Sequence, residues 1–104
     1  MITDYDAEND ILYIHKGFEK EERFKGNIDA GDLILDMSTK GRVAGIEILN
    51  ATSYLKEFDV DKELLENLKK ADFEATHLRS SVTISLKLTG AREQKMKIAV
   101  ANLS

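Results

Sequence analysis

A strict alternation of apolar and polar residues near the carboxyl end constrains this chain most. The pattern occupies two runs, Ser81–Leu88 and Met96–Val100, which a turn at Thr89–Ala91 separates. Successive side chains of a strand point to opposite faces, so a period of two predicts strands with one apolar face. An antiparallel register that pairs Val82 with Val100 and Leu86 with Met96 gathers the apolar residues on that face. The sequence therefore predicts a C-terminal hairpin.

Two further hairpins are predicted closer to the amino end. In the first, Tyr5 lies beside Leu12 across a polar turn at residues 7–10. The second joins Leu33–Met37 to Val43–Leu49, and its register is chosen because it places apolar residues opposite one another. That register pairs Leu33 with Ile48, Leu35 with Ile46, and Met37 with Ala44. Residues 23–28 are expected to add a short edge strand.

One helix is predicted over about residues 61–70. Its apolar side chains recur at helical spacing, and they are Val60, Leu64, Leu65, Leu68 and Ala71. Asp59 or Asp61 is expected to supply its N-cap, and Phe73–Leu78 is expected to return to strand. The fold class predicted is α+β: an antiparallel β-meander, one main helix, then the C-terminal antiparallel hairpin, in a single domain of residues 1–104.

Composition excludes several classes of protein. The chain has no Cys, which excludes disulfides, thiolate metal sites and Cys nucleophiles. Its first residues carry neither a basic region nor an apolar run, and the longest apolar run, Ile11–Ile14, is far below a membrane span of about 20 residues. We expect a cytoplasmic protein.

Four acidic residues near the start, Asp4, Asp6, Glu8 and Asp10, raise the question of calcium. The EF-hand pattern fails, because Asn9 stands where that loop needs Gly and His15 where it needs Glu. Asp6 is well placed to stabilise a turn instead. We expect no metal and no cofactor.

Catalytic residues are equally weakly indicated. His15 and His77 are the two imidazoles, and neither lies in a zinc-like spacing. Asp36 and Glu47 are expected on the sheet face away from the apolar set, where they could form a carboxylate pair. Acid–base chemistry would require one of them to be desolvated. No catalytic residue is assigned.

Charge is distributed unevenly along the chain. Residues 1–38 carry ten acidic and four basic residues, whereas residues 79–104 carry one acidic and five basic residues. The basic side chains Lys87, Arg92, Lys95 and Lys97 form a candidate interaction surface, on which Lys87 is expected to face Lys95. Solvent, an acidic protein surface or nucleic acid could cover it. Nucleic acid is disfavoured because no aromatic residue interleaves with the lysines.

Three stretches together resemble a known family. They are Tyr5-Asp6 with Asp10-Ile11-Leu12-Tyr13-Ile14, Leu33-Ile34-Leu35-Asp36, and Gly41-Arg42-Val43-Ala44-Gly45-Ile46-Glu47-Ile48-Leu49-Asn50-Ala51. This combination, over about residues 1–55, resembles the small prokaryotic proteins of domain-of-unknown-function family 2283. The resemblance implies a small, β-rich protein and brings no activity, cofactor or catalytic residue.

A small non-enzymatic interaction or regulatory domain is the function that we expect. The alternative is a small hydrolase or ligand-binding enzyme that uses Asp36, Glu47 or His77, and nucleic-acid binding through the basic hairpin comes third. One short helix cannot cover a sheet of about seven strands spaced nearly 5 Å apart. Ile34 and Val43 lie opposite the main apolar set, so we expect a homodimer that covers them.

Overall fold

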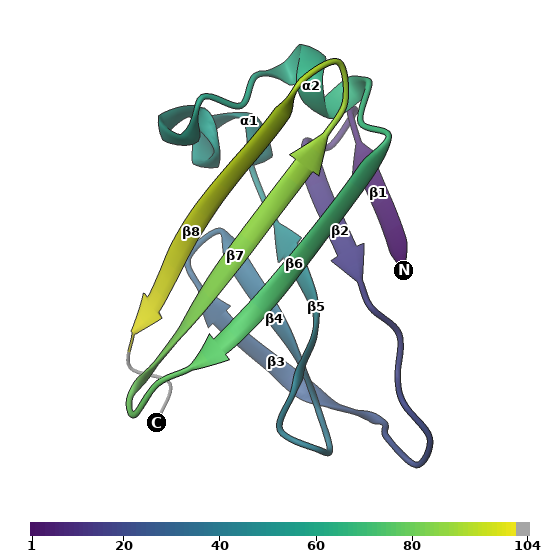
Figure 1. The fold of residues 1–104 in the computed structure, drawn as a ribbon, viewed down its shortest axis with the longest axis vertical. Helices are drawn as coiled ribbons and strands as arrows, with labels where there is room; N and C mark the ends of the chain where they lie inside the picture. Colours follow the sequence, from purple (N-terminus) through teal and green to yellow (C-terminus); the bar gives the residue numbers. More distant parts are fainter. Residues whose placement is uncertain (102–104) are drawn as a thin grey trace. The chain divides into compact units, whose positions relative to one another are not determined.

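A computed structural model describes residues 1–101 of the chain. The chain divides into two compact units, residues 1–54 and the residues from Leu55 onward. The first contains β1 (Ile2–Asp6), β2 (Ile11–His15), β3 (Phe24–Ala30), β4 (Leu33–Ser38), β5 (Val43–Ile48) and α1 (Ala51–Tyr54) (Figure 1). The second contains the 3₁₀ turn η1 (Lys56–Phe58), α2 (Lys62–Glu66), β6 (Lys70–His77), β7 (Ser81–Thr89) and β8 (Glu93–Ala101). The α+β class is confirmed, and the expectation that one domain forms stays a prediction.

The first unit is a five-stranded antiparallel sheet in the order β1-β2-β5-β4-β3. The predicted first hairpin is confirmed, because Tyr5 pairs with Leu12 and Asp6 with Ile11. The sheet departs from a simple meander because β2 pairs with β5, with Ile14 opposite Ile46. The expected edge strand near residues 23–28 is β3, which extends to Ala30.

The hairpin of β4 and β5 follows the predicted register except at its turn end. Leu33 pairs with Ile48 and Leu35 with Ile46, but Met37 pairs with Val43 rather than with Ala44. The register shifts between Asp36 and Met37, so Ala44 is skipped in this ladder. A β-bulge inserts one such extra residue and increases the local twist.

The helix is shorter than predicted. α2 ends at Glu66, and its N-cap is Asp61, whose carboxylate accepts a hydrogen bond from the Leu64 amide at 2.9 Å. Asp59 instead has a left-handed backbone, with a φ of 63°, at the end of η1. The chain turns to strand already at Lys70, which pairs with Thr89. Cross-strand pairing thus prevails over the helical spacing of Leu68 and Ala71.

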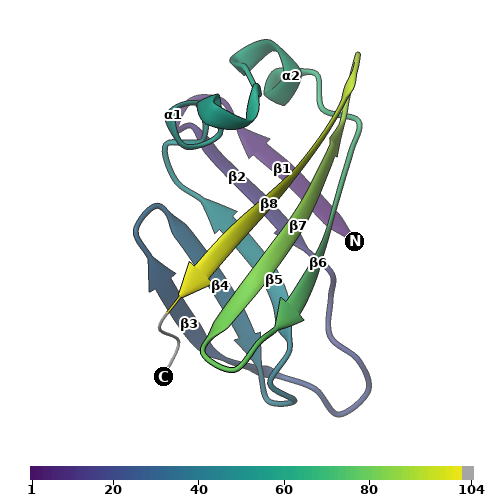
Figure 2. The ribbon, with the colours of Figure 1, turned by 60° about the vertical axis from the view of Figure 1, so that its left-hand side comes forward.

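The second unit contains a three-stranded antiparallel sheet in the order β6-β7-β8 (Figure 2). The predicted hairpin is confirmed as β7 and β8, with Val82 opposite Val100 and Leu86 opposite Met96. The predicted strand at 73–78 is confirmed as β6, which begins earlier and makes this a sheet of three strands. No helix among the described residues is long and apolar enough to cross a membrane.

Each sheet has one apolar face with buried side chains. In the first unit these include Leu12, Ile14, Leu33, Leu35, Ile46 and Ile48. In the second they include Phe73, Val82, Ile84, Leu86, Leu88, Met96, Ile98 and Val100. Leu68, which the helical pattern places in the core, is only half-buried, because it follows the end of α2.

Candidate functional site

The first sheet carries a row of polar residues on the face opposite its apolar side chains. His15 of β2 and Asp36 of β4 are both paired with Gly45 of β5, and Asp36 is also paired with Asn27 of β3. The next row on the same face pairs Tyr13 with Glu47 and Glu47 with Ile34. We call Tyr13, His15, Asp36, Gly45 and Glu47 the histidine–aspartate face.

Gly45 is required where His15 and Asp36 converge. A Cβ atom at this position would lie 2.6 Å from Cδ2 of His15 and 3.0 Å from Oδ2 of Asp36. Real Cβ atoms do not come within 3.0 Å of other heavy atoms, so any larger residue would displace the imidazole, and the carboxylate would have to shift slightly. Glycine therefore lets two buried polar side chains lie over one strand.

The imidazole of His15 is held by its neighbours. Its Nδ1 atom accepts a hydrogen bond from the Gly17 amide at 2.8 Å, which assigns the proton of the neutral ring to Nε2. The ring centroid lies 5.0 Å from that of Phe18, edge to face, and 5.9 Å from that of Tyr13. Tyr13 and His15 of the sheet thus form a continuous group with Phe18 of the loop that follows β2.

Asp36 links this group to the edge of the sheet. Its Oδ1 atom accepts a hydrogen bond from Nδ2 of Asn27 at 2.6 Å. Burial raises the pKa of the Tyr13 hydroxyl, and the carboxylates of Asp36 and Glu47 raise it further. Tyr13 therefore stays a neutral hydroxyl at physiological pH. Together these groups can donate and accept hydrogen bonds to a polar ligand or to a protein surface.

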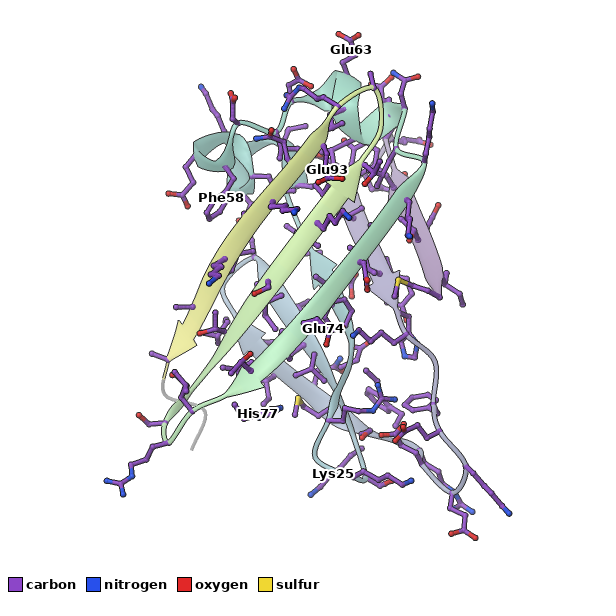
Figure 3. All side chains as sticks on the ribbon, viewed as in Figure 1. Lys25, Phe58, Glu63, Glu74, His77 and Glu93 are labelled. Atoms are coloured by element: carbon purple, nitrogen blue, oxygen red, sulfur yellow. The ribbon has the colours of Figure 1, made fainter. Side chains whose placement is uncertain are left out.

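Asp36 and Glu47 lie on one sheet face, as predicted, and the structure adds His15 and Tyr13 to them. His77 belongs to the other compact unit. It lies at the end of β6 in the second unit, where its side chain is exposed (Figure 3). The convergence of His15 and Asp36 at Gly45 was not predicted. The one signal for it in the sequence is an isolated glycine inside an apolar strand.

The acidic residues near the start stabilise local structure. Asp6 accepts hydrogen bonds from the amides of Glu8 and Asn9, each at 3.1 Å, as its predicted turn role requires. The Asp10 carboxylate accepts from the Tyr5 hydroxyl at 2.7 Å and from Thr52 Oγ1 at 2.6 Å. Across residues 1–101, no three His, Asp or Glu side chains gather as metal ligands would.

The buried Glu22 forms an ion pair with the half-buried Arg42, which no pattern in the sequence indicates. The Glu22 side chain is fully covered, and its Oε2 atom accepts from Ser38 Oγ at 2.6 Å and from Arg42 Nε at 3.0 Å. Arg42 Nη2 also donates to the Gly17 carbonyl at 2.9 Å. These hydrogen bonds lower the pKa of Glu22 from 4.5 to about 2. The guanidinium thereby fixes the loop between β2 and β3 onto the turn between β4 and β5.

The lysines of the predicted interaction surface lie on the exposed face of the second sheet. Lys87 and Lys95 are cross-strand partners, as expected, and Lys97 pairs with Ser85. Both oxygens of Glu93 are engaged, one at 3.5 Å from Lys87 and the other at 3.7 Å from Lys95.

Arg92 of the same predicted surface is engaged elsewhere. Its Nη2 atom donates to the Asp59 carbonyl at 2.9 Å and lies 3.7 Å from Oδ2 of Asp61. The guanidinium thus fastens the turn between β7 and β8 to the segment before α2.

An exposed group of apolar side chains surrounds the histidine–aspartate face. Ile2, which is 60% exposed, is the cross-strand partner of His15, and Phe18, which is 44% exposed, contacts the same ring. Tyr13 and Ile34 are half-buried on this face. We call Ile2, Tyr13, Phe18 and Ile34 the apolar patch. Val43, which we expected to need a partner, is buried in the single chain.

Comparisons with known proteins place the chain in a family. Residues 2–51 match the family described as protein of unknown function (DUF2283). An uncharacterized protein of Methanocaldococcus jannaschii is 39% identical over 93 residues, covering 88% of this chain and 75% of the relative. A Methanosarcina mazei protein with the name "Putative hypoxanthine phosphoribosyltransferase" is 26% identical over 93 residues, covering 89% of this chain and 71% of that protein. No solved structure matches the chain. The chain therefore belongs to the DUF2283 family of proteins of unknown function.

Proposed function

We propose that this chain is a small non-enzymatic protein-interaction domain and that it forms a homodimer through the apolar patch. The observation that carries the proposal is the exposure of Ile2 and of the loop residue Phe18 beside the sheet face that carries Tyr13 and Ile34. Aromatic and large aliphatic side chains in a partly buried group are typical of the centre of a protein–protein interface. Asp4, the cross-strand partner of Tyr13, and Glu47 add charged groups to this surface.

A second copy is the partner that this face fits best. In a symmetric dimer the same patch lies on both sides of the contact, so the apolar side chains of one copy cover those of the other. The acidic residues around the patch then face one another, and their repulsion is screened by salt. We therefore expect the dimer to strengthen as the salt concentration rises.

Sedimentation equilibrium at micromolar concentrations tests the proposal. The wild-type chain should give a dimer mass, and Ile2→Ser/Phe18→Ser should give a monomer mass. The matched control is Phe24→Ser/Leu78→Ser, which removes two apolar side chains of 51% and 60% exposure that lie outside the patch. It should remain a dimer. A wild-type monomer at every loading, or a dimer that survives Ile2→Ser/Phe18→Ser, would refute the proposal.

A ligand-binding enzyme is the second candidate, and the convergence of His15 and Asp36 over Gly45 favours it. A neutral imidazole beside a carboxylate can move a proton to or from a bound ligand. The test is hydrolysis of p-nitrophenyl acetate and p-nitrophenyl phosphate by the wild-type chain and by His15→Gln. Turnover that His15→Gln abolishes would support the enzyme, and equal rates for both proteins would exclude it for these substrates.

A further inference from the structure

β8 forms one of the two edges of the second sheet, and β6 forms the other. β8 pairs with β7 on one side, and among residues 1–101 no other strand pairs with it. Its first residues are covered locally, because Gln94 Nε2 donates to the Phe58 carbonyl at 3.0 Å. The stretch Lys95–Ala101 makes no further backbone hydrogen bond within the described residues. An edge strand of this kind presents alternate backbone N–H and C=O groups that can pair with another extended chain.

The side chains of β8 are apolar on one face of the sheet and basic on the other. Met96, Ile98 and Val100 are buried, whereas Lys95 and Lys97 are exposed. A strand that pairs with β8 in register must therefore continue an apolar row on one face and meet two ammonium groups on the other. The β8 edge therefore requires a partner strand with apolar side chains on one face and acidic side chains on the other.

The charge on this edge is incompletely neutralised. Lys87 and Lys95 share the carboxylate of Glu93, and Lys97, opposite Ser85, has no ion pair within residues 1–101. A shallow depression of about 470 Å³ lies over this face, and its lining includes these lysines together with Asp72 and Glu74 of β6. The two carboxylates lie on the β6 side of β7, whereas Lys95 and Lys97 lie on β8, so the ammonium groups are the charged groups next to the β8 edge.

Pairing of β8 with the β8 strand of a second copy is disfavoured. Antiparallel association of two identical edges brings lysine near lysine, and like charges opposite one another destabilise a sheet. Lysines on edge strands commonly prevent such self-association. The same lysines attract a strand with acidic residues at alternate positions.

We propose that the β8 edge binds an extended segment of a partner protein in which acidic residues alternate with apolar ones, so that the segment adds a fourth strand to the sheet. The acidic residues pair with Lys95 and Lys97, and the apolar residues extend the row of Met96 and Ile98. β6 shows the required pattern, because Asp72 and Glu74 alternate with the apolar side chains of Ala71, Phe73 and Ala75. Figure 3 shows Glu74 and Glu93 on the side of the sheet that faces the viewer.

An acetylated and amidated peptide with the sequence of residues 70–77 is a defined probe for this edge. Its binding to the full chain is followed by NMR shifts and by hydrogen exchange of the backbone amides. We expect saturable shifts and slower exchange within Lys95–Ala101, because strand addition forms new backbone hydrogen bonds there. A scrambled peptide of the same composition should bind weakly, since it lacks the alternation.

Charge-reversal variants provide the decisive test of the binding experiment. Lys95→Glu/Lys97→Glu should weaken binding by about tenfold or more, because two attractive pairs become repulsive. A peptide with both acidic residues changed to Lys should restore binding to this variant. The matched control Lys20→Glu/Lys25→Glu changes two exposed lysines of the other unit and should bind the original peptide as the wild-type chain does.

Four outcomes would overturn this proposal. They are equal binding of the scrambled peptide, absence of protection at the β8 amides, self-association that Lys95→Glu/Lys97→Glu abolishes, and binding of a single-stranded oligonucleotide where the peptide fails. The proposal does not depend on the homodimer, because Ile2→Ser/Phe18→Ser should bind the peptide normally.

Discussion

Gly45 and His15 are cross-strand partners in the first sheet, and Cδ2 of the imidazole lies 2.6 Å from where a Cβ atom of residue 45 would be. Gly45→Ala should therefore destabilise the chain by about 1–3 kcal/mol, the usual cost of forcing extra volume into a packed site. Urea unfolding measures the difference. Gly26→Ala is the matched control, because no atom lies within 4 Å of its added Cβ, and it should change stability by no more than about 1 kcal/mol. Equal effects of the two variants would contradict the close packing of His15 over Gly45.

The Glu22–Arg42 ion pair should make stability depend on pH. The pKa of Glu22 is depressed in the folded chain, from 4.5 to about 2, so its stabilising contribution is fully present above pH 4.5 and is lost as pH falls toward 2. The urea midpoint of the wild-type chain should approach that of Glu22→Gln over this range. Glu22→Gln has no carboxylate to titrate and serves as the reference. A constant difference between the two proteins from pH 7 to pH 2.5 would contradict the assignment.

The hydrogen bond from Thr52 to Asp10 should stabilise the start of α1. Thr52→Val keeps the shape of the side chain but removes the hydroxyl that donates to Asp10 at 2.6 Å. We expect a loss of about 1.5–3 kcal/mol in the free energy of unfolding, as for a hydrogen bond to a charged acceptor. Thr52→Ser retains the donor and should lose less. If Thr52→Ser proves as unstable as Thr52→Val, the hydroxyl is not the stabilising group.

The apolar faces of both sheets should be sensitive to truncation. Ile46→Ala and Ile84→Ala each remove a fully buried side chain and should cost about 2–5 kcal/mol in thermal or urea unfolding. Leu68→Ala removes a half-buried side chain and should cost less. A larger loss for Leu68→Ala than for Ile84→Ala would show that the core is wrongly placed.

The sequence by itself determined the faces of the strands and the local turn chemistry. Alternation identifies which side chains share a face, so the pairing of Val82 with Val100 could be predicted from the residues alone. The turn role of Asp6 could be predicted because its carboxylate acts on backbone amides within three residues. For the N-cap the sequence offered Asp59 or Asp61, and the structure selects Asp61.

Only the tertiary structure decided how distant segments meet. The pairing of β2 with β5, the bulge at Ala44 and the early end of α2 depend on which backbone groups find partners far along the chain. Glu22 and Arg42 lie outside the strands, in segments without periodicity, so nothing in the sequence connects them. His15 and Asp36 converge because two strands distant in sequence both flank Gly45, and this juxtaposition exists only once the sheet has formed.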